Sequence, residues 1–342
     1  MRDARIAAMK KLKTLVFEYI TGGGFNSFKL PEPLAQEGLL MLQALVDDLT
    51  RIELVDPLVM LDYRMIGRLT HHINSHIIKP EHECQQKFLG LLAECDAVWV
   101  VAPESDDVLQ NLCQTVEKSG KILLNSSSTA VAVAGNKWLT YQCLQKHCIA
   151  TVPTQKLVDF SYLPGEWIIK SVNGVGCTDS YVVVDEQEFT SITESIDKQK
   201  YIIQPHKQGE KTSLSCLFKN GRGWLVCANR QYFERIDQQY QLTGITVNFT
   251  SDTAKYHIVS NIALAMQGLW GYVGIDLIET AGEILVLEIN PRLTTSYAGI
   301  HEALGINCAS AVLDLLSGDP QLEPTRNQPV YINITGQENH AN

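Results

Sequence analysis

The chain has 342 residues, 45% of them hydrophobic and 19% charged, which is typical of a globular protein of two or three domains. Its net charge of −10, without any block of Lys and Arg, argues against a nucleic-acid or anionic-membrane partner. The N-terminus does not resemble a signal peptide, no apolar run is long enough to span a membrane and the nine cysteines include no CxxC pair, so we expect a soluble, cytoplasmic protein with reduced thiols.

The first third of the chain alternates short apolar strands with helical patterns. Strands separated by helices predict a parallel sheet with helices on both faces. We therefore predict an α/β domain at residues 1–125. Its expected strands are Leu15–Tyr19, Leu58–Leu61, Ala97–Val101 and Ile122–Leu124, and its expected helices are Pro33–Leu49, Gln85–Cys95 and Asp106–Lys118.

A polar stretch at Asn125–Ser128 separates this domain from a small α+β lobe, which we place at residues 126–206. A loop with the sequence Asn-Gly-Val-Gly-Cys at 173–177 lies between two of its predicted strands. The expected helices are Ala130–Ala134, Lys137–Lys146 and Glu186–Ile196, and the expected strands are Trp167–Ser171, Tyr181–Val184 and Tyr201–Gln204.

The last third, residues 207–342, predicts a larger lobe built on an antiparallel sheet. Short turns at Asn220-Gly221 and Ala281-Gly282 join consecutive strands, which indicates antiparallel pairing. The expected strands are Thr212–Phe218, Gly223–Phe233, Tyr272–Glu279 and Ile284–Ile289, and the expected helices are Asp252–Met266 and Cys308–Leu316.

Oxygen-bearing side chains gather on two neighbouring strands of this lobe. Glu288 and Asn290 share one face of a strand because strand side chains repeat every second residue, and Asp276 on the next strand adds a third oxygen. Three oxygen ligands on a rigid sheet suit Mg²⁺. The alternative is a half-buried strand with polar groups facing solvent, but apolar neighbours fix the opposite face as core.

Two arginines are candidates for binding an anionic substrate. Arg292 directly follows the Glu288–Asn290 strand, where a guanidinium can clamp a carboxylate or a transferring phosphoryl group. Arg230 lies on a predicted central strand; if it faces inward it implies an anionic ligand, and otherwise it is a surface arginine on an edge strand. Thr294–Ser296 supplies donors to an acyl phosphate or simply caps a helix.

The glycine loop is a candidate phosphate cradle. Gly174 and Gly176 allow backbone N–H groups to approach phosphates, although the same residues suit a hairpin turn. Lys170 ends the strand before this loop and is placed to neutralise a phosphate. Lys137 opens a predicted helix, where an exposed lysine with no ligand is the alternative.

In chain order, Lys137, Lys170 with its glycine loop and the Glu288–Arg292 run resemble the ATP-grasp superfamily, over roughly residues 125–320. The first third resembles the pre-domain that precedes this fold. The resemblance implies a parallel α/β pre-domain, a small α+β lid lobe and a larger antiparallel core lobe. It also implies that the protein binds ATP with Mg²⁺, or Mn²⁺ in its place.

The same resemblance assigns the nucleotide contacts. It places Lys137 and Lys170 on the phosphates and the glycine loop over them as a lid. The backbone of Gln204, Pro205 and His206 would form a hinge that reads the adenine edge, and Glu210 would accept the ribose hydroxyls. Many family members carry a glutamate where this chain has Gln204, so the resemblance leaves the role of that side chain open.

The reaction implied is the ligation of a carboxylate to an amine. ATP would transfer its γ-phosphoryl group to the carboxylate, and an amine would attack the acyl phosphate, releasing ADP and phosphate. Within the superfamily, the Phe17–Tyr19 strand with its glycine loop and the run at 288–297 resemble the tyramine–glutamate ligases of methanofuran biosynthesis and their bacterial relatives. That resemblance implies L-glutamate as one substrate and tyramine or tyrosine as the other.

Two alternatives stay open. One is an ATP-grasp ligase with a D-Ala–D-Ala-like or purine-pathway substrate, which would share every motif above. The other is a non-catalytic ATP-binding regulator, which would be expected to have lost a metal ligand. The expected partners are small-molecule carboxylates and amines, with no nucleic acid and no membrane, and the sequence is compatible with a homodimer.

Two further features have no assigned role. His71, His72, His76 and His82 with Cys84 form a histidine-rich patch, but no acidic partner or close Cys pair completes a zinc site. Gly22–Gly24 follows the first strand and either binds an anion or is a mobile loop bordering the acceptor pocket.

Overall fold

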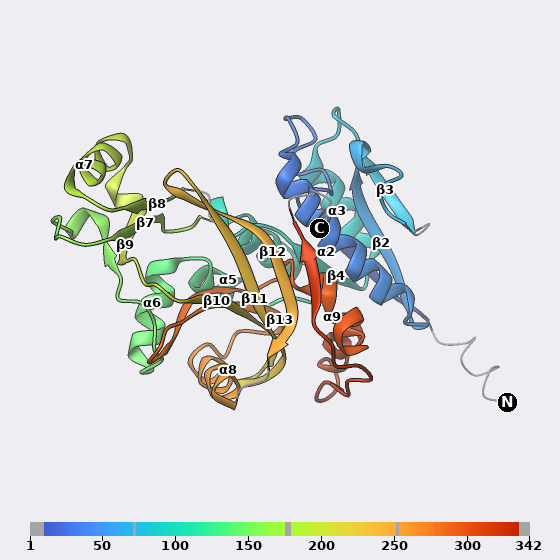
Figure 1. The fold of residues 1–342 in the computed structure, drawn as a ribbon. Coiled ribbons are helices and arrows are strands. Elements are labelled where there is room, and N and C mark those ends of the chain that lie inside the picture. Colours follow the sequence, from blue (N-terminus) through green and yellow to red (C-terminus); the bar gives the residue numbers. More distant parts are fainter. Residues whose placement is uncertain (1–9, 71–72, 175–178, 251–252, 335–342) are drawn as a thin grey trace, which may run out of the picture.

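The structure, a computed structural model, describes residues 10–70, 73–174, 179–250 and 253–334. Within these ranges the strands form sheets of five, four and six strands. Figure 1 shows the long strands of the six-stranded sheet in the middle, the four-stranded sheet on one side and the five-stranded sheet on the other. The predicted architecture of a parallel α/β pre-domain, a small lobe and a larger antiparallel lobe is confirmed.

The pre-domain sheet is parallel throughout and has the strand order β3-β2-β1-β4-β5. The order reverses between β1 and β4, and ligands of open parallel sheets bind outside the carboxyl ends of the strands at such a point. The elements are β1 (Leu12–Glu18), α2 (Glu32–Thr50), β2 (Val55–Asp62), β3 (Asn74–Ile78), α3 (Cys84–Glu94), β4 (Ala97–Val101), α4 (Val108–Lys118) and β5 (Ile122–Leu123).

The small lobe has a four-stranded antiparallel sheet with the order β6-β9-β7-β8 and a core of its own. Ile169, Val183 and Ile203 from three of its strands pack against Phe189 of the lobe's helix, so this lobe is stabilised independently of the large sheet. The elements are β6 (Gln155–Lys156), β7 (Trp167–Ser171), β8 (Ser180–Val183), α7 (Glu186–Ser195) and β9 (Tyr201–Pro205).

The large lobe is an antiparallel sheet with the order β14-β13-β10-β11-β12-β15. One face is apolar and buried, with Leu214, Ile275 and Leu277 fully covered. Three helices cover it, including the two at the start of the 126–206 segment that we assigned to the small lobe. The elements are α5 (Ser128–Ala134), α6 (Lys137–Lys146), β10 (Glu210–Lys219), β11 (Arg222–Ile236), β12 (Gln239–Thr250), α8 (Thr253–Ala265), β13 (Gly271–Glu279), β14 (Ile284–Asn290) and β15 (Val330–Asn333).

The other face of the large sheet packs at one end against the pre-domain. A single apolar cluster joins Leu45 and Trp99 of the pre-domain to Leu217 of β10 and to α9 (Tyr297–Leu304) and α10 (Cys308–Asp314). The hydroxyl of Tyr297 in α9 donates to Asp48 Oδ2 of α2 at 2.8 Å inside this cluster. The pre-domain and the large lobe therefore share one core.

No helix in the described part of the chain is both long enough and apolar enough to cross a bilayer.

Candidate active site

The candidate metal ligands lie on β13 and β14, two neighbouring strands at one edge of the large sheet. Asp276 of β13 and Glu288 of β14 are direct cross-strand partners, and Asn290 pairs with Gly274 two residues along. Asn290 Nδ2 donates to Asp276 Oδ2 at 3.0 Å. A register shift after Asp276 lets Leu277 pair with Val286, so the apolar face stays in the core while the polar side chains share the opposite face.

The electrostatics of this row favour a cation. Burial, with the nearby charge of Glu288, raises the pKa of Asp276 to about 6, although Asn290 and Gln231 each donate a hydrogen bond to it. Two facing carboxylates in a poorly hydrated place repel each other unless a positive charge lies between them. Two carboxylates and an amide oxygen are hard ligands that fit Mg²⁺.

Gln231 was missed by the sequence analysis. Its Nε2 donates to Asp276 Oδ1 at 3.0 Å, so it orients the carboxylate from a third strand, β11. The only signal for Gln231 in the sequence was its position next to Arg230, and Arg230 was chosen as the candidate.

Lys137 connects the row of Asp276, Glu288 and Asn290, which we call the metal row, to the glycine loop. It opens α6, its backbone N–H donates to Val172 O at 2.9 Å, and its side chain is buried. The Nζ atom lies 3.0 Å from Glu288 Oε1 and also donates to the carbonyl of Gly174. The lysine is thus placed where phosphates held between loop and metal row would meet it.

Arg292 is held by a residue of the pre-domain. Its Nη2 donates to Glu104 Oε2 at 3.0 Å, and its Nε lies 2.9 Å from Glu104 Oε1. Burial opposes the positive charge, but the carboxylates of Glu104, Glu288 and Asp276 together outweigh it and raise the pKa of Arg292. The sequence analysis missed Glu104; its signal was an acidic residue just beyond the carboxyl end of the buried strand β4.

Two more pre-domain carboxylates face the same arginine. Glu37 Oε2 accepts a hydrogen bond from Thr295 Oγ1 at 3.0 Å, and Glu18 at the end of β1 is fully buried against Thr21. Burial raises the pKa of both carboxyl groups, and the charge of Arg292 counteracts this rise. The carboxyl ends of β1 and β4, where the strand order reverses, therefore open toward Arg292.

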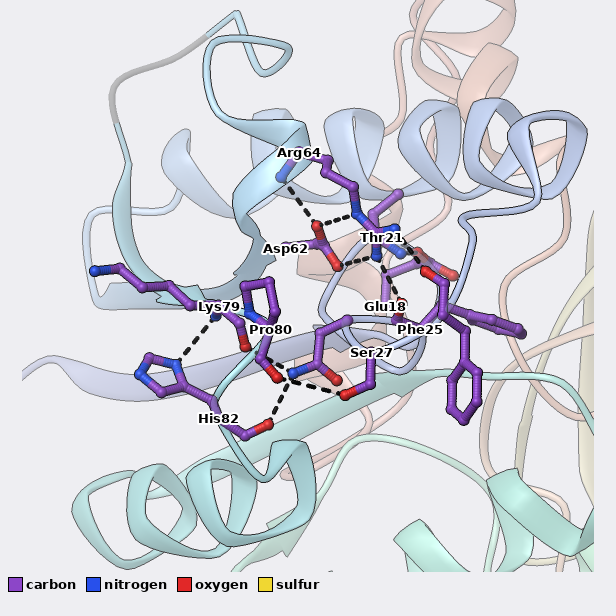
Figure 2. A network of polar contacts seen from close by, with 11 residues as sticks. Glu18, Thr21, Phe25, Ser27, Asp62, Arg64, Lys79, Pro80 and His82 are labelled. Carbon is purple, nitrogen blue, oxygen red and sulfur yellow. Dashed lines mark hydrogen bonds and ion pairs between the residues drawn. The ribbon is translucent and has the colours of Figure 1, made fainter.

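The loop at Gly22–Gly24 is fixed by its surroundings. Gly23 has φ +106°, and a Cβ there would lie 2.5 Å from Ile78. Figure 2 shows Arg64 bound to Asp62 beside this loop; Arg64 Nη2 also donates to Phe25 O at 2.7 Å. These contacts explain the glycines by close packing and favour a rigid loop over a mobile one.

The expected hinge lies where the small and large lobes join. Gln204 Nε2 donates to Thr154 Oγ1 at 2.9 Å inside the lobe, so its side chain is used structurally, and Pro205 pairs with Trp167. His206 lies between Glu166 Oε2 at 2.9 Å and Tyr240 OH at 3.0 Å. A hollow of about 500 Å³ opens here, lined among others by His206, Glu210, Lys211, Arg230 and Tyr240.

The structure does not bring Arg230 to Arg292. Across the sheet, Arg230 of β11 lies in one register row with Thr212 of β10 and Leu277 of β13. Asp276 lies in the neighbouring row, with Ser213 and Asn229. Because strand neighbours point to opposite faces, Arg230 lies on the face opposite the metal row. It is bound to Glu210 and stacks over Phe249, with 3.7 Å from its guanidinium carbon to the ring centre.

The remaining candidates are placed as follows. Lys170 lies on β7, paired with Ser180 and Ile202, next to the glycine loop. Gly176 falls outside the described residues, as do His71 and His72. His76 lies on β3, and His82 Nδ1 accepts from the backbone of Lys79. The described residues contain no cluster of three or more His, Cys, Asp or Glu side chains fit to hold a metal, since the third ligand of the metal row is an asparagine.

Comparison with known families shows to which superfamily this chain belongs. The sequence profile of an ATP-grasp domain matches residues 134–296, and that of the pre ATP-grasp 3 domain matches residues 55–131. The chain belongs to the ATP-grasp superfamily. It is therefore an enzyme of the ATP-grasp ligase family.

Two similar proteins are tyramine–L-glutamate ligases of Methanocaldococcus species. The one from Methanocaldococcus jannaschii is 29% identical over 84% of this chain and 84% of its own length. The one from Methanocaldococcus fervens is 28% identical over 84% of this chain and 88% of its own.

Solved structures share the fold. An ATP-grasp superfamily protein from Archaeoglobus fulgidus superposes with a TM-score of 0.71 at 24% identity, covering 94% of this chain and 92% of its own. The ADP complex of N5-carboxyaminoimidazole synthetase from Staphylococcus aureus gives 0.70 at 14% identity, covering 94% and 83%. At these identities the likeness concerns the fold alone.

Proposed function

We propose that this ATP-grasp enzyme forms an amide from a carboxylate and an amine through an acyl phosphate. The substrates proposed are L-glutamate and either tyramine or tyrosine, in the cytoplasmic synthesis of a methanofuran-type cofactor. One observation carries the proposal: Lys137 pairs with Glu288 in the row of Asp276, Glu288 and Asn290, and the buried charge of Arg292 acts on Asp276 and Glu288 of the same row. The similarity to tyramine–L-glutamate ligases over most of both chains supports the substrates.

The nucleotide would lie between the two antiparallel sheets. Asp276, Glu288 and Asn290 would hold Mg²⁺, which would neutralise phosphate charge and orient the β- and γ-phosphates. Lys137 and Lys170 would contact the phosphates, with Glu210 on the ribose and the backbone of residues 204–206 beside the adenine. Of these residues, His206 and Glu210 line the hollow of about 500 Å³ at the junction of the small and large lobes.

The chemistry requires positioning more than a nucleophilic side chain. A carboxylate oxygen of the substrate attacks the γ-phosphorus, the bond to the β-phosphate oxygen breaks, and ADP leaves. The amine nitrogen then attacks the acyl carbon, and phosphate leaves with the bonding electrons. Arg292 and Lys137 supply fixed positive charge for both steps.

The acceptor is expected to be an amine because of the pre-domain carboxylates. An alkylamine arrives as an ammonium ion and must lose a proton before it attacks. Glu37 of α2 is only half-buried, so an ammonium would be attracted to it and a proton accepted there. Glu18 is fully buried and bound to Ile20 and Thr21, so it would not meet the amine directly.

A direct assay tests the proposal. Purified protein is incubated with ATP, Mg²⁺, L-glutamate and either tyramine or tyrosine, and products are identified by mass spectrometry. The expected products are the glutamyl amide, ADP and phosphate. AMP instead of ADP would overturn the acyl-phosphate route, and an amide formed from alanine but never from glutamate would discard the substrate while keeping the ligase.

Two observations bear on the alternatives. All three proposed metal ligands are present, which favours catalysis over a regulator that only binds ATP. The eight described cysteines are all free thiols, which fits a reducing compartment such as the cytoplasm.

A further inference from the structure

Glu104 reaches the active site from the pre-domain. It follows β4 by three residues, at the point where the strand order of the parallel sheet reverses, and only 7% of it is exposed. Asp106 and Asp107, two and three residues further on, have φ of 52° and 56°, a left-handed conformation that costs about 1 kcal/mol or more per residue. The fold thus tolerates local backbone strain next to this carboxylate.

Helix α5 fixes the carboxylate from the other side. A Cβ at Gly135, the residue that ends α5, would lie 3.0 Å from the Cβ of Glu104. The backbone of the ATP-grasp part therefore passes directly against Glu104, which restricts where its side chain can turn. The carboxylate is left with Arg292 as its partner.

The contacts of Arg292 divide its guanidinium into two edges. A guanidinium has five N–H groups. Glu104 takes the edge formed by Nε and Nη2, and Nη1 donates one N–H to Leu293 O at 3.1 Å. One N–H on each Nη atom remains without a partner among the described residues. The outer fork is the edge between Nη1 and Nη2, next to the Nε–Nη2 edge that Glu104 takes, and the geometry of such an edge matches a carboxylate or a phosphoryl group.

The contact on the inner edge is close but incompletely satisfied. Nε and Glu104 Oε1 are 2.9 Å apart as an ion pair, yet their angle leaves both atoms without a hydrogen bond within the described ranges. Such buried, half-satisfied groups persist where the surrounding structure holds them in place. A small rotation of the guanidinium toward a bound anion would be compatible with this geometry.

Without Glu104 the guanidinium would have competing partners. Asp276 and Glu288 both exert their charge on Arg292, and these are the residues proposed to hold the metal. An arginine that swung onto them would neutralise the metal ligands and turn its outer fork away from the substrate. Glu104 opposes this rotation because it holds the edge of the guanidinium formed by Nε and Nη2.

We propose that Glu104 is a positioning residue that holds the inner edge of Arg292 so that its outer fork binds the substrate carboxylate or the phosphoryl group. The inference rests on the proposed function for the identity of that ligand, but the Glu104–Arg292 geometry does not depend on it. It also means that one active-site arginine is aimed by a different domain from the one that carries it.

The first test needs no substrate. In protein with ¹⁵N-labelled arginine side chains, the Arg292 signals, identified by their loss in Arg292→Lys, should show slow rotation about the guanidinium bonds. Glu104→Gln keeps the shape and removes the charge, and it should make this rotation fast. Restricted rotation that survives in Glu104→Gln would overturn the proposal whatever the substrate is.

The second test measures kinetics. Loss of a charge-assisted contact should raise the KM for the carboxylate about tenfold or more in Glu104→Gln, with the KM for ATP changed less than about twofold. In an Arg292→Lys background the same change should have little further effect. Additive effects of the two substitutions would show that Glu104 acts only through domain packing.

Asp48→Asn is the matched control. Asp48 is also a buried pre-domain carboxylate that binds the large lobe, through Tyr297, but it does not touch Arg292. It should lower Tm and leave both the Arg292 signals and the carboxylate KM unchanged. If Glu104→Gln behaves in the same way, the positioning role is refuted.

If Glu104→Gln does not fold, Glu104→Asp replaces it. The aspartate retains the charge but is too short to face both nitrogens, so it should shift the same two readouts in the same direction. Wild-type protein that makes no amide from glutamate would refute the proposed substrate, and the labelled-arginine experiment would still decide the role of Glu104.

Discussion

The ammonium of Lys137 lies 3.0 Å from the carboxylate of Glu288, although 151 residues separate them in the chain. Both side chains are largely withdrawn from water, with 8% and 20% of their surface exposed. The lysine therefore compensates the metal row when no cation is bound, and phosphates would have to share or displace this contact. Nucleotide binding would therefore change the charge that Glu288 experiences, because the phosphates and Glu288 would compete for the same ammonium.

Lys137→Met should destabilise the metal-free protein because it leaves Glu288 facing Asp276 without a cation. We expect a loss of about 2 kcal/mol in the free energy of unfolding, measured by urea denaturation in EDTA. ATP affinity measured by calorimetry should fall about tenfold or more. The exposed contact of Lys219 with Gly318 provides the control, since Lys219→Met should change neither quantity.

Asp276 should make stability depend on pH in the metal-free protein. Its pKa is about 6 in the folded state against an ordinary 3.8, so between about pH 4 and pH 6 the folded state binds the proton more tightly than the unfolded state. The free energy of unfolding should therefore fall as pH rises through this range, by roughly 2–3 kcal/mol from this group. Denaturation at several pH values should show a flatter profile for Asp276→Asn; identical profiles would refute the assignment.

Lys170→Ala should weaken nucleotide binding. The substitution removes a positive charge beside the glycine loop in a protein of net charge −10, and we expect about a tenfold higher Kd for ATP by calorimetry. Lys198→Ala, an exposed lysine of the same lobe, should leave the Kd unchanged. Equal affinity of wild type and Lys170→Ala would make this lysine structural.

Arg230→Gln separates two roles for this arginine. Because Arg230 binds Glu210 on the face away from the metal row, the change should raise the Kd for ATP severalfold through Glu210. The KM for the carboxylate should stay within about twofold of wild type. A large rise in that KM would restore the original expectation that Arg230 binds substrate.

Glu37→Gln should impair the step that involves the amine. If the carboxylate attracts the ammonium and accepts its proton, the KM for the amine should rise about tenfold, while the KM values for ATP and carboxylate change little. The control is Glu32→Gln on the same helix, whose carboxylate forms an exposed pair with Arg68. An unchanged amine KM would remove Glu37 from the acceptor site.

Local patterns in the sequence predicted that Asp276, Glu288 and Asn290 lie together on neighbouring strands. The period of two along β14 puts Glu288 and Asn290 on one face, and Ile289 between them is buried as expected. Lys137 and Arg292 were also placed near this row, because both lie next to elements that a strand or helix pattern defines.

Contacts between elements far apart in the chain could not be predicted in this way. Glu104 meets Arg292 across 188 residues, and no periodicity in either segment indicates the other. The sequence left the face of Arg230 open for the same reason, because the face of a strand residue depends on the strand's partners. Gln231, one residue on, is the side chain that meets Asp276.

Some elements lacked the usual signals. Strand β12 follows a hairpin turn at Asp237-Gln238 that contains no glycine; Asp237 itself adopts the left-handed conformation, with φ 54°. Helix α9 begins after Ser296, whose hydroxyl does not cap the helix but lies 3.2 Å from that of Ser215. Strand β3 begins with Asn-Ser-His and is too polar to stand out, and β15, with four residues, is too short.

The apolar cluster shared by the pre-domain and the large lobe limits how such enzymes can be recombined. In this cluster Leu45 and Trp99 of the pre-domain belong to the same core as α9 and α10. A pre-domain transplanted from a relative to change acceptor preference would replace these two side chains and would no longer fit the two helices of the host. The transplant would also bring its own carboxylate, or none, to Arg292. Exchange of acceptor specificity in this architecture should therefore require the two helices to be inherited together with the pre-domain.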